Sequence, residues 1–407
     1  MRATVTVATI GTATLLATSG AVAYAVTAAP STSTAASSST SASSSTSSAC
    51  VSKAHAGPRV GRFGGIISAA PKASCQSASG PALSASGAAG NNAVGTPPLL
   101  YHGGPVMSTA TTGTLVITPI FWNPAGHPMD PGYVSLITQY LGDVAAASGG
   151  TDNVFSTATE YSGTNGTIRY QVQLGTPVND TGALPKSSCR LTRVDKTGIY
   201  VDGSGYNLCI DDAQVTAETN RVVNAGNLPR DLAHIYVLYL PKHVESCFFA
   251  GSVGTTKNAC TINHEPSAAY CAYHSEFSGN TVYANMPFPI YTSPVGFTCG
   301  SDAQSAGLGA VQTPNGNPDA DTEVSPSSHE VMEAITDPDT STGWYDSSGF
   351  ENGDECAYVF GSVSGPSGQF YNQTINGNHY LTQEEFSNKA FDPATGTGGC
   401  LQSEAGA

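Results

Sequence analysis

Ten cysteines constrain the fold of this 407-residue chain more than any other feature. None belongs to a Cys-x-x-Cys pair, which argues against a zinc ribbon or a thioredoxin-like redox site. In an exported protein an even number of cysteines indicates disulfides. The first two are expected to pair separately. For the last eight, pairing of chain neighbours is the simplest of about a hundred arrangements, and it predicts Cys189–Cys209, Cys247–Cys260, Cys271–Cys299 and Cys356–Cys400.

The N-terminus indicates export. Residues 1–25 carry one charge, at Arg2, and small residues at Ala21, Ala23 and Ala25 offer cleavage sites for a signal peptide. An uncleaved membrane anchor is the alternative, but the stretch is rich in Thr, Ser and Gly, so cleavage is favoured. No later segment is apolar enough to span a bilayer. The expected product is a secreted, extracellular protein.

The composition divides the chain near residue 100. Residues 26–100 are predicted to be a low-complexity linker, because the stretches 31–49 and 76–98 consist largely of Ser, Thr, Ala and Gly and cannot bury a core. The piece between those stretches, around Arg62, is predicted to be a short docking or processing segment. Residues 101–407 are long enough for one large globular domain.

Apolar periodicity in that domain predicts strands that alternate with helices. Alternation of this kind argues for an α/β domain, with an α+β arrangement as the alternative. The most apolar strand, 234–241, is expected at the centre of the sheet. The predicted strands are 113–122, 167–174, 234–241 and 281–291, and the predicted helices are 131–147, 211–226 and 326–336.

The last of these helices carries the strongest functional signal. Ser325 is its expected N-cap and Pro326 its expected first residue, while a proline just beyond its end blocks continuation. His329 and Glu333 are one helical turn apart, so they would project from one face about 6 Å from each other. The spacing predicts two side chains that can reach the same ligand.

The H-E-x-x-E pattern is typical of a helix-borne metal site. In the related H-E-x-x-H pattern two histidines bind zinc, and the glutamate is the general base on the bound water. Here Glu333 would replace the second histidine as a ligand beside His329, and Glu330 would be the catalytic base. A short motif of this kind also occurs by chance on solvent-facing helices. The third ligand is expected from Asp339 or a later acid, among Asp346, Glu351, Asp354 and Glu355.

Further candidates lie outside this helix. His274, in YCAYHSEF, could supply another metal nitrogen, although a histidine between aromatic residues and near a disulfide is more often structural. His102 precedes two glycines and could either cap a tight turn or face a site. A carboxylate pair for glycoside cleavage, Glu330 with Glu351 or Asp354, ranks lower, because two tryptophans are too few to stack a sugar chain.

The charge is strongly acidic, with a formal net value of −15. From Ser301 onward there are sixteen Asp or Glu residues against one Lys, which disfavours nucleic acid and anionic membranes as partners and attracts cations. Most of this excess is interpreted as a solubility device. Four residues at alternate positions are similar to the start of a calcium loop, so calcium is a second candidate metal: Asn317, Asp319, Asp321 and Glu323.

Two regions resemble the EXORDIUM, or phosphate-induced, family of extracellular plant proteins and its bacterial relatives. YHGGPVMSTATTGTLVITPIFWNP (101–124) is similar to the opening of that family, and 328–361 with 371–386 resembles its His-Glu-x-x-Glu helix, acidic Gly-Asp-x-Cys turn and closing stretch. The resemblance covers most of 101–402 and implies a secreted or wall-associated protein without a settled activity. Asp339 lies where plant members need no acid. The matched polar positions are His329, Glu330, Glu333, Trp344, Asp354 and Cys356.

The sequence therefore predicts a single large secreted α/β domain, stabilised by disulfides, with a zincin-like active helix. The predicted function is metal-dependent hydrolysis, with zinc as the cofactor and an extracellular peptide or cell-wall component as the substrate. The alternative is a non-catalytic extracellular or wall-associated binding or signalling protein, in which the same helix is structural or holds a fixed ion.

Overall fold

The computed structural model describes residues 64, 70–71, 98–189, 207–251, 259–261, 270–289 and 297–406. These residues all belong to one compact unit within Ser48–Ala407. The expected signal peptide, the low-complexity stretches 31–49 and 76–97, and the first two cysteines lie outside the described residues. No helix of the described part of the chain has the length and apolar character needed to cross a bilayer.

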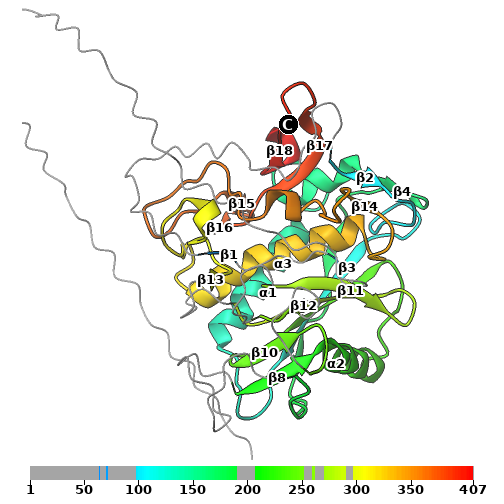
Figure 1. The fold of residues 1–407 in the computed structure, drawn as a ribbon, viewed down its shortest axis with the longest axis vertical. Helices are drawn as coiled ribbons and strands as arrows, with labels where there is room; N and C mark the ends of the chain where they lie inside the picture. The colour runs from blue at the N-terminus through cyan, green and yellow to red at the C-terminus, as the bar shows by residue number, and fades with distance from the viewer. Residues whose placement is uncertain are drawn as a thin grey trace, which may run out of the picture. The chain divides into compact units, whose positions relative to one another are not determined.

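A mixed sheet forms the framework of the domain (Figure 1). Its order is β11-β12-β9-β3-β6, with β7 beside the far end of β3. Neighbouring strands run parallel except for β11 and β12, so β11 is an antiparallel edge strand. The strands are β3 (Leu115–Trp122), β6 (Val172–Leu174), β7 (Val178–Asp180), β9 (His234–Tyr239), β11 (Tyr273–Phe277) and β12 (Thr281–Met286).

Each face of the sheet packs against different helices. On the central strand β9, Ile235, Val237 and Tyr239 join the core that contains α1 (Pro131–Ala146) and α3 (Pro318–Thr336). Tyr236 and Leu238 point to the opposite core, which contains α2 (Asp212–Ala225). Burial of both faces is the reason that the strand is apolar throughout instead of alternating. The predicted α/β class and the central position of this strand are confirmed.

Smaller elements connect and cover these layers. The paired strands are β1 (Ala70–Pro71) with β13 (Phe297–Thr298), β2 (Leu100–Tyr101) with β14 (Trp344–Tyr345), β4 (Ser162–Gly163) with β5 (Gly166–Thr167), β8 (Leu208–Asp211) with β10 (Val244–Cys247), β15 (Gln373–Ile375) with β16 (Asn378–Tyr380), and β17 (Glu385–Asp392) with β18 (Thr397–Leu401). Short 3-10 helices are η1 (Val154–Glu160), η3 (Gln304–Ala306), η4 (Asp354–Cys356) and η5 (Glu404–Gly406).

Two of the predicted helices begin at the capping residues that the sequence offers. Asp130 accepts hydrogen bonds from the first-turn amides of α1, and Asp211 forms a capping box with Gln214 at the start of α2. The predicted strand 167–174 is wrong as a single element. Its middle residues leave the sheet, because Ser108 Oγ donates to the carbonyl oxygens of Arg169 and Gln171 there.

The helix with the H-E-x-x-E motif begins two turns earlier than predicted. Asn317 is its N-cap and accepts a hydrogen bond from the Ala320 amide, while Pro326 lies inside the helix. Ser325 is not a cap, since its Oγ instead accepts the Gln383 amide. An internal proline removes one backbone hydrogen bond and costs roughly 3 kcal/mol or more. Burial of nearly all of α3 offsets that cost, which a local signal cannot reveal.

The four predicted disulfides of the described residues are confirmed: Cys189–Cys209, Cys247–Cys260, Cys271–Cys299 and Cys356–Cys400. Because all four close between chain neighbours, each cross-links one local stretch of the domain. The longest loop, between Cys356 and Cys400, spans a sequence separation of 44 residues.

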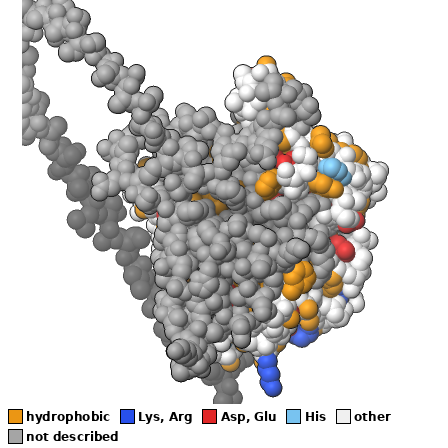
Figure 2. Space-filling model, viewed as in Figure 1, with side chains coloured by type: hydrophobic (Ala, Val, Ile, Leu, Met, Phe, Trp, Pro, Cys, Tyr) orange, Lys and Arg blue, Asp and Glu red, His pale blue; other side chains and the backbone are white. Residues whose placement is uncertain are grey.

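The acidic C-terminal region is largely an interior feature, so its interpretation as a solubility device is wrong for most of its members. Few acidic side chains are visible among the described residues of the face in Figure 2. Twelve of the sixteen acids after Ser301 are buried: Asp302, Asp321, Glu323, Glu330, Glu333, Asp337, Asp346, Glu351, Asp354, Glu355, Glu384 and Glu385. Interior carboxylates are costly unless hydrogen-bonded, protonated or bound to a cation, so these residues need a specific explanation.

Candidate metal centre

α3 places the motif residues in the interior of the domain. It runs beside β11 and β12 on one face of the sheet (Figure 1). His329, Glu330 and Glu333 are each 0% exposed. His329 Nε2 lies 3.0 Å from Glu333 Oε2, which confirms that these two side chains share one face of the helix.

Asp354 adds a third donor from the turn that opens η4. Its Oδ1 lies 3.7 Å from His329 Nε2, and its backbone amide donates to Glu333 Oε1 at 2.9 Å. That amide occupies Oε1 and leaves Oε2 as the Glu333 oxygen that faces His329. The ligand atoms of His329, Glu333 and Asp354 lie within 4.8 Å of one another, as those of a metal site do.

The turn can approach the helix this closely because it contains Gly353. A Cβ at this position would lie 2.6 Å from His329 Nδ1 and 2.9 Å from Glu333 Oε1. Gln383 completes the support, since its Nε2 lies 2.8 Å from His329 Nδ1 and donates to the Gly353 carbonyl at 2.7 Å. The imidazole is thereby held with Nε2 directed at the two carboxylates.

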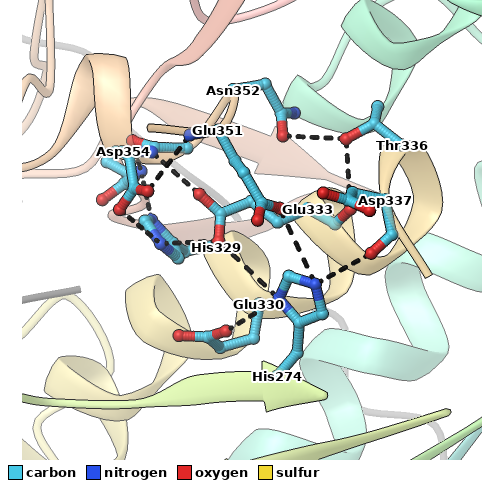
Figure 3. Close-up of polar contacts among 11 residues, drawn as sticks. His274, His329, Glu330, Glu333, Thr336, Asp337, Glu351, Asn352 and Asp354 are labelled. Atoms are coloured by element: carbon cyan, nitrogen blue, oxygen red, sulfur yellow. Dashed lines mark hydrogen bonds and ion pairs between the residues drawn. The ribbon is translucent and has the colours of Figure 1, made fainter. Parts of the chain in front are cut away.

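A second set of donors lies on the other side of Glu333. His274 of β11, Glu333 and Glu351 form another group whose ligand atoms lie within 4.8 Å of one another (Figure 3). His274 Nε2 is 3.7 Å from Glu351 Oε2. Of the two readings of His274 from the sequence, ligand or structural, its position beside these carboxylates favours the ligand.

Burial and mutual repulsion act on the carboxylates of this cluster. The pKa of Glu330 is raised well above its ordinary value, first by burial and then by the charges of Glu333, Asp354, Glu351 and Glu385. The pKa of Asp354 is raised in the same way, first by burial and then by Glu333 and Glu351. Among the described residues, neither oxygen of Glu330 has a hydrogen-bond partner. Without a cation, Glu330 and Asp354 therefore favour protonation.

Three of the predicted third ligands lie outside these groups: Asp339, Asp346 and Glu355. Asp339 Oδ1 accepts a hydrogen bond from Ser341 Oγ in the turn after α3. Asp346 is buried, but its Oδ1 accepts the amides of Ser348 and Phe350 and so closes its own turn. Of the third ligands proposed from the sequence, the structure brings Glu351 and Asp354 into the cluster.

The residues considered for calcium lie at the start of α3. Asn317 caps the helix, and Asp321 accepts hydrogen bonds from the Asn315 side chain and from the Asn317 amide. A helical backbone sends alternate residues to different sides, so these four side chains do not converge as they would in an extended loop. Calcium binding stays a prediction.

His102 has a role in a turn and lies outside both groups. Its ring is exposed, stacks on Tyr345 with 3.6 Å between centroids, and has Nε2 3.1 Å from the Tyr345 carbonyl oxygen. These contacts join β2 to β14, whose strands pair at this point. The turn-capping reading of His102 is therefore favoured over a place in the metal site.

The N-terminal part of the chain reaches this cluster at Gly64. Its amide donates to the His274 carbonyl at 3.1 Å, and its carbonyl accepts the His274 amide at 3.2 Å. A Cβ on Gly64 would lie 2.6 Å from Glu351 Oε1. Most of the predicted docking segment around Arg62 lies outside the described residues, but Gly64 forms an antiparallel bridge with His274 at the edge of β11.

Comparison with known proteins adds no assignment: no family model, curated protein or solved structure matches the chain. The resemblance to the EXORDIUM family stays a prediction.

Proposed function

We propose that this chain is a secreted metal-dependent hydrolase, a zinc peptidase in which His329, Glu333 and Asp354 hold the ion. The convergence of these three donors on one point carries the proposal. One imidazole nitrogen and two carboxylate oxygens are ligands that zinc accepts, and three protein ligands leave a fourth position open. A zinc ion in such a site lowers the pKa of its bound water, so that the water can attack near neutral pH.

Glu330 is the proposed general base. It follows His329 directly on α3, and its buried carboxylate has no hydrogen-bond partner among the described residues. It would accept the proton of the attacking water and then give that proton to the leaving amine. The raised pKa that burial produces in Glu330 suits a group that must both accept and return a proton.

A peptide substrate is favoured over a sugar by the edge of β11. Gly64 already pairs there with His274 through two backbone hydrogen bonds, directly beside the candidate ligands. An extended peptide recognises a sheet edge by the same main-chain contacts. The donor set and the backbone pairing at this sheet edge together therefore support hydrolysis of an extended chain.

The complete burial of His329, Glu330 and Glu333 favours a second candidate. A site without solvent access can hold an ion that only stabilises the fold. The chain would then be a non-catalytic extracellular binding or signalling protein, and Glu330 would have no catalytic task.

The substitution Glu330→Gln separates the two candidates. In a peptidase we expect it to lower cleavage of an unblocked peptide library by about 100- to 10,000-fold, the usual contribution of a general base, and to retain zinc. Glu323→Gln is the matched control, because Glu323 is a buried glutamate of the same helix outside both ligand groups. Equal rates for wild type and Glu330→Gln, or a zinc-loaded wild type that cleaves nothing, would refute the peptidase proposal.

A further inference from the structure

Glu333 belongs to both of the groups of potential ligands that contain a histidine. One group contains His329 and Asp354, and the other contains His274 and Glu351. The ligand atoms of a group all lie within 4.8 Å of one another, and within the described part of the chain no group contains both His274 and His329. Two atoms bound to one zinc at about 2.1 Å each cannot lie more than about 4.2 Å apart. The two groups therefore mark two neighbouring positions instead of one.

The geometry of Glu333 is that of a bridging carboxylate. The Asp354 amide holds Oε1, so Oε2 is the oxygen that faces the imidazoles. Oε2 lies 3.0 Å from His329 Nε2 and 3.9 Å from His274 Nδ1. In proteins with two-metal sites the ions lie about 3.5–4 Å apart, a spacing at which one carboxylate can reach both.

The tautomer of His274 directs a lone pair at the second position. Its Nε2 lies 3.0 Å from the Asp337 carbonyl oxygen, which can only accept, so Nε2 carries the proton. In the neutral ring, Nδ1 then carries the lone pair. It faces Glu330 and Glu333, while Glu351 Oε2 lies 3.7 Å from Nε2 at the other side of the ring (Figure 3). A backbone carbonyl that fixes the other ring nitrogen is the usual support of a metal-binding histidine.

Glu330 provides an independent indication of a cation. Its side chain is 0% exposed, its Oε2 lies 3.5 Å from His274 Nδ1, and among the described residues neither oxygen accepts a hydrogen bond. An ionised carboxylate that is fully buried and accepts no hydrogen bond is unfavourable unless a positive charge lies beside it. A cation beside His274 would supply that charge. Two divalent ions would also balance the four negative charges that Glu330, Glu333, Glu351 and Asp354 carry when ionised.

We propose that this chain binds two divalent metal ions, the second held by His274, Glu351 and the bridging Glu333. Nitrogen and carboxylate oxygen donors in this ratio suit zinc or manganese. The inference extends the proposed function, because it places a second ion next to the first. It does not depend on the reaction, since the readout is metal content.

The first test measures zinc per chain by mass spectrometry, on the full secreted chain loaded with zinc and dialysed against metal-free buffer. We expect two zinc ions in the wild type and one in His274→Ala. Glu351→Gln is the second variant, with the same expected loss of one ion, in case His274→Ala does not fold. His102→Ala is the matched control and should keep both ions, because His102 is an exposed histidine outside the groups.

Other results would overturn the inference. One zinc in the wild type, unchanged in His274→Ala, would refute the second ion and leave the proposed function standing. Loss of all zinc in folded His274→Ala would show a single site that uses both histidines. A wild type without zinc would refute both proposals. Manganese loading gives an independent readout, because two Mn²⁺ ions about 4 Å apart give a spin-coupled resonance spectrum and a single ion does not.

Discussion

At the scale of residues, this protein places unusually many carboxylates in its interior. Some accept hydrogen bonds from nearby groups, as Asp346 does from two backbone amides of its own turn. Others converge on two histidines, where a cation would compensate them. Glu384 belongs to neither kind: it is 8% exposed and lies outside both ligand groups, and burial raises its pKa to about 7. Such a residue makes the stability of the fold depend on pH.

We predict that Glu384→Gln reduces the pH dependence of stability. The pKa of Glu384 rises from 4.5 in the unfolded chain to about 7 in the fold, so the folded state binds the proton more tightly. The free energy of unfolding therefore falls as pH rises from 4.5 to 7, by about 3 kcal/mol for this group. Urea unfolding at pH 5 and pH 8 should show a fall smaller by that amount in Glu384→Gln.

The control is Glu404→Gln, which changes an exposed glutamate and should keep the wild-type pH dependence. If the free energy of unfolding depends on pH in the same way in Glu384→Gln and the wild type, Glu384 does not cause the pH dependence.

At the scale of elements, the edge strand β11 connects the sheet to the candidate metal centre. It supplies His274 from its buried side, and its outer edge pairs with the backbone of Gly64. The absence of a side chain at Gly64 is required, since a Cβ would meet Glu351 Oε1 at 2.6 Å and Thr340 Cγ2 at 2.8 Å. The N-terminal segment can therefore lie on this edge only with a glycine at the point of closest approach.

Gly64→Leu should displace this pairing. The added side chain would collide with Glu351 and Thr340, and the His274 amide would lose its acceptor. Loss of one backbone hydrogen bond worth about 1 kcal/mol corresponds to an increase of roughly fivefold in amide hydrogen exchange at His274. Exchange measured by NMR checks this, with Ala110→Leu as a control at an exposed position. Unchanged exchange at His274 would mean that Gly64 does not protect β11.

At the scale of the whole molecule, disulfides stabilise long loops and hold one ligand in place. Cys356 and Asp354 lie in the same short helix, η4, and the bridge to Cys400 ties that helix to β18. Closing a loop of 44 residues stabilises a fold by about 4 kcal/mol in the chain-entropy description. This bridge therefore stabilises the fold and anchors one side chain of the candidate metal centre.

Replacing both Cys356 and Cys400 by Ser should lower the free energy of unfolding by about 4 kcal/mol and also weaken zinc binding, because Asp354 loses its anchored helix. The control is the same double replacement at Cys247 and Cys260, which closes a separation of 13 residues away from both His-containing ligand groups. That control should cost about 3 kcal/mol and leave zinc affinity unchanged. Denaturant unfolding and zinc titration measure the two effects. Equal zinc affinities in the two variants would contradict the proposal that the Cys356–Cys400 bridge holds Asp354 in place.

Local patterns determined the elements and the cross-links. Apolar periodicity predicted β3, α1, α2 and β9 to within a few residues. The spacing of apolar residues along an element reflects directly which of its faces are buried. The four described disulfides followed from chain order. The pairing of His329 with Glu333 followed from helical geometry alone.

Only the tertiary structure decided which distant residues lie beside His329 and Glu333 of α3. Asp339 and Asp346 are as acidic and as near in sequence as Glu351 and Asp354, but their turns fold away from the cluster. His274 arrives from an edge strand more than fifty residues earlier, through the pairing of β11 with β12. The extension of α3 past Pro326 depends on burial that no local signal expresses. Contacts between distant segments are set by the packing of whole layers, and that packing is a property of the complete fold.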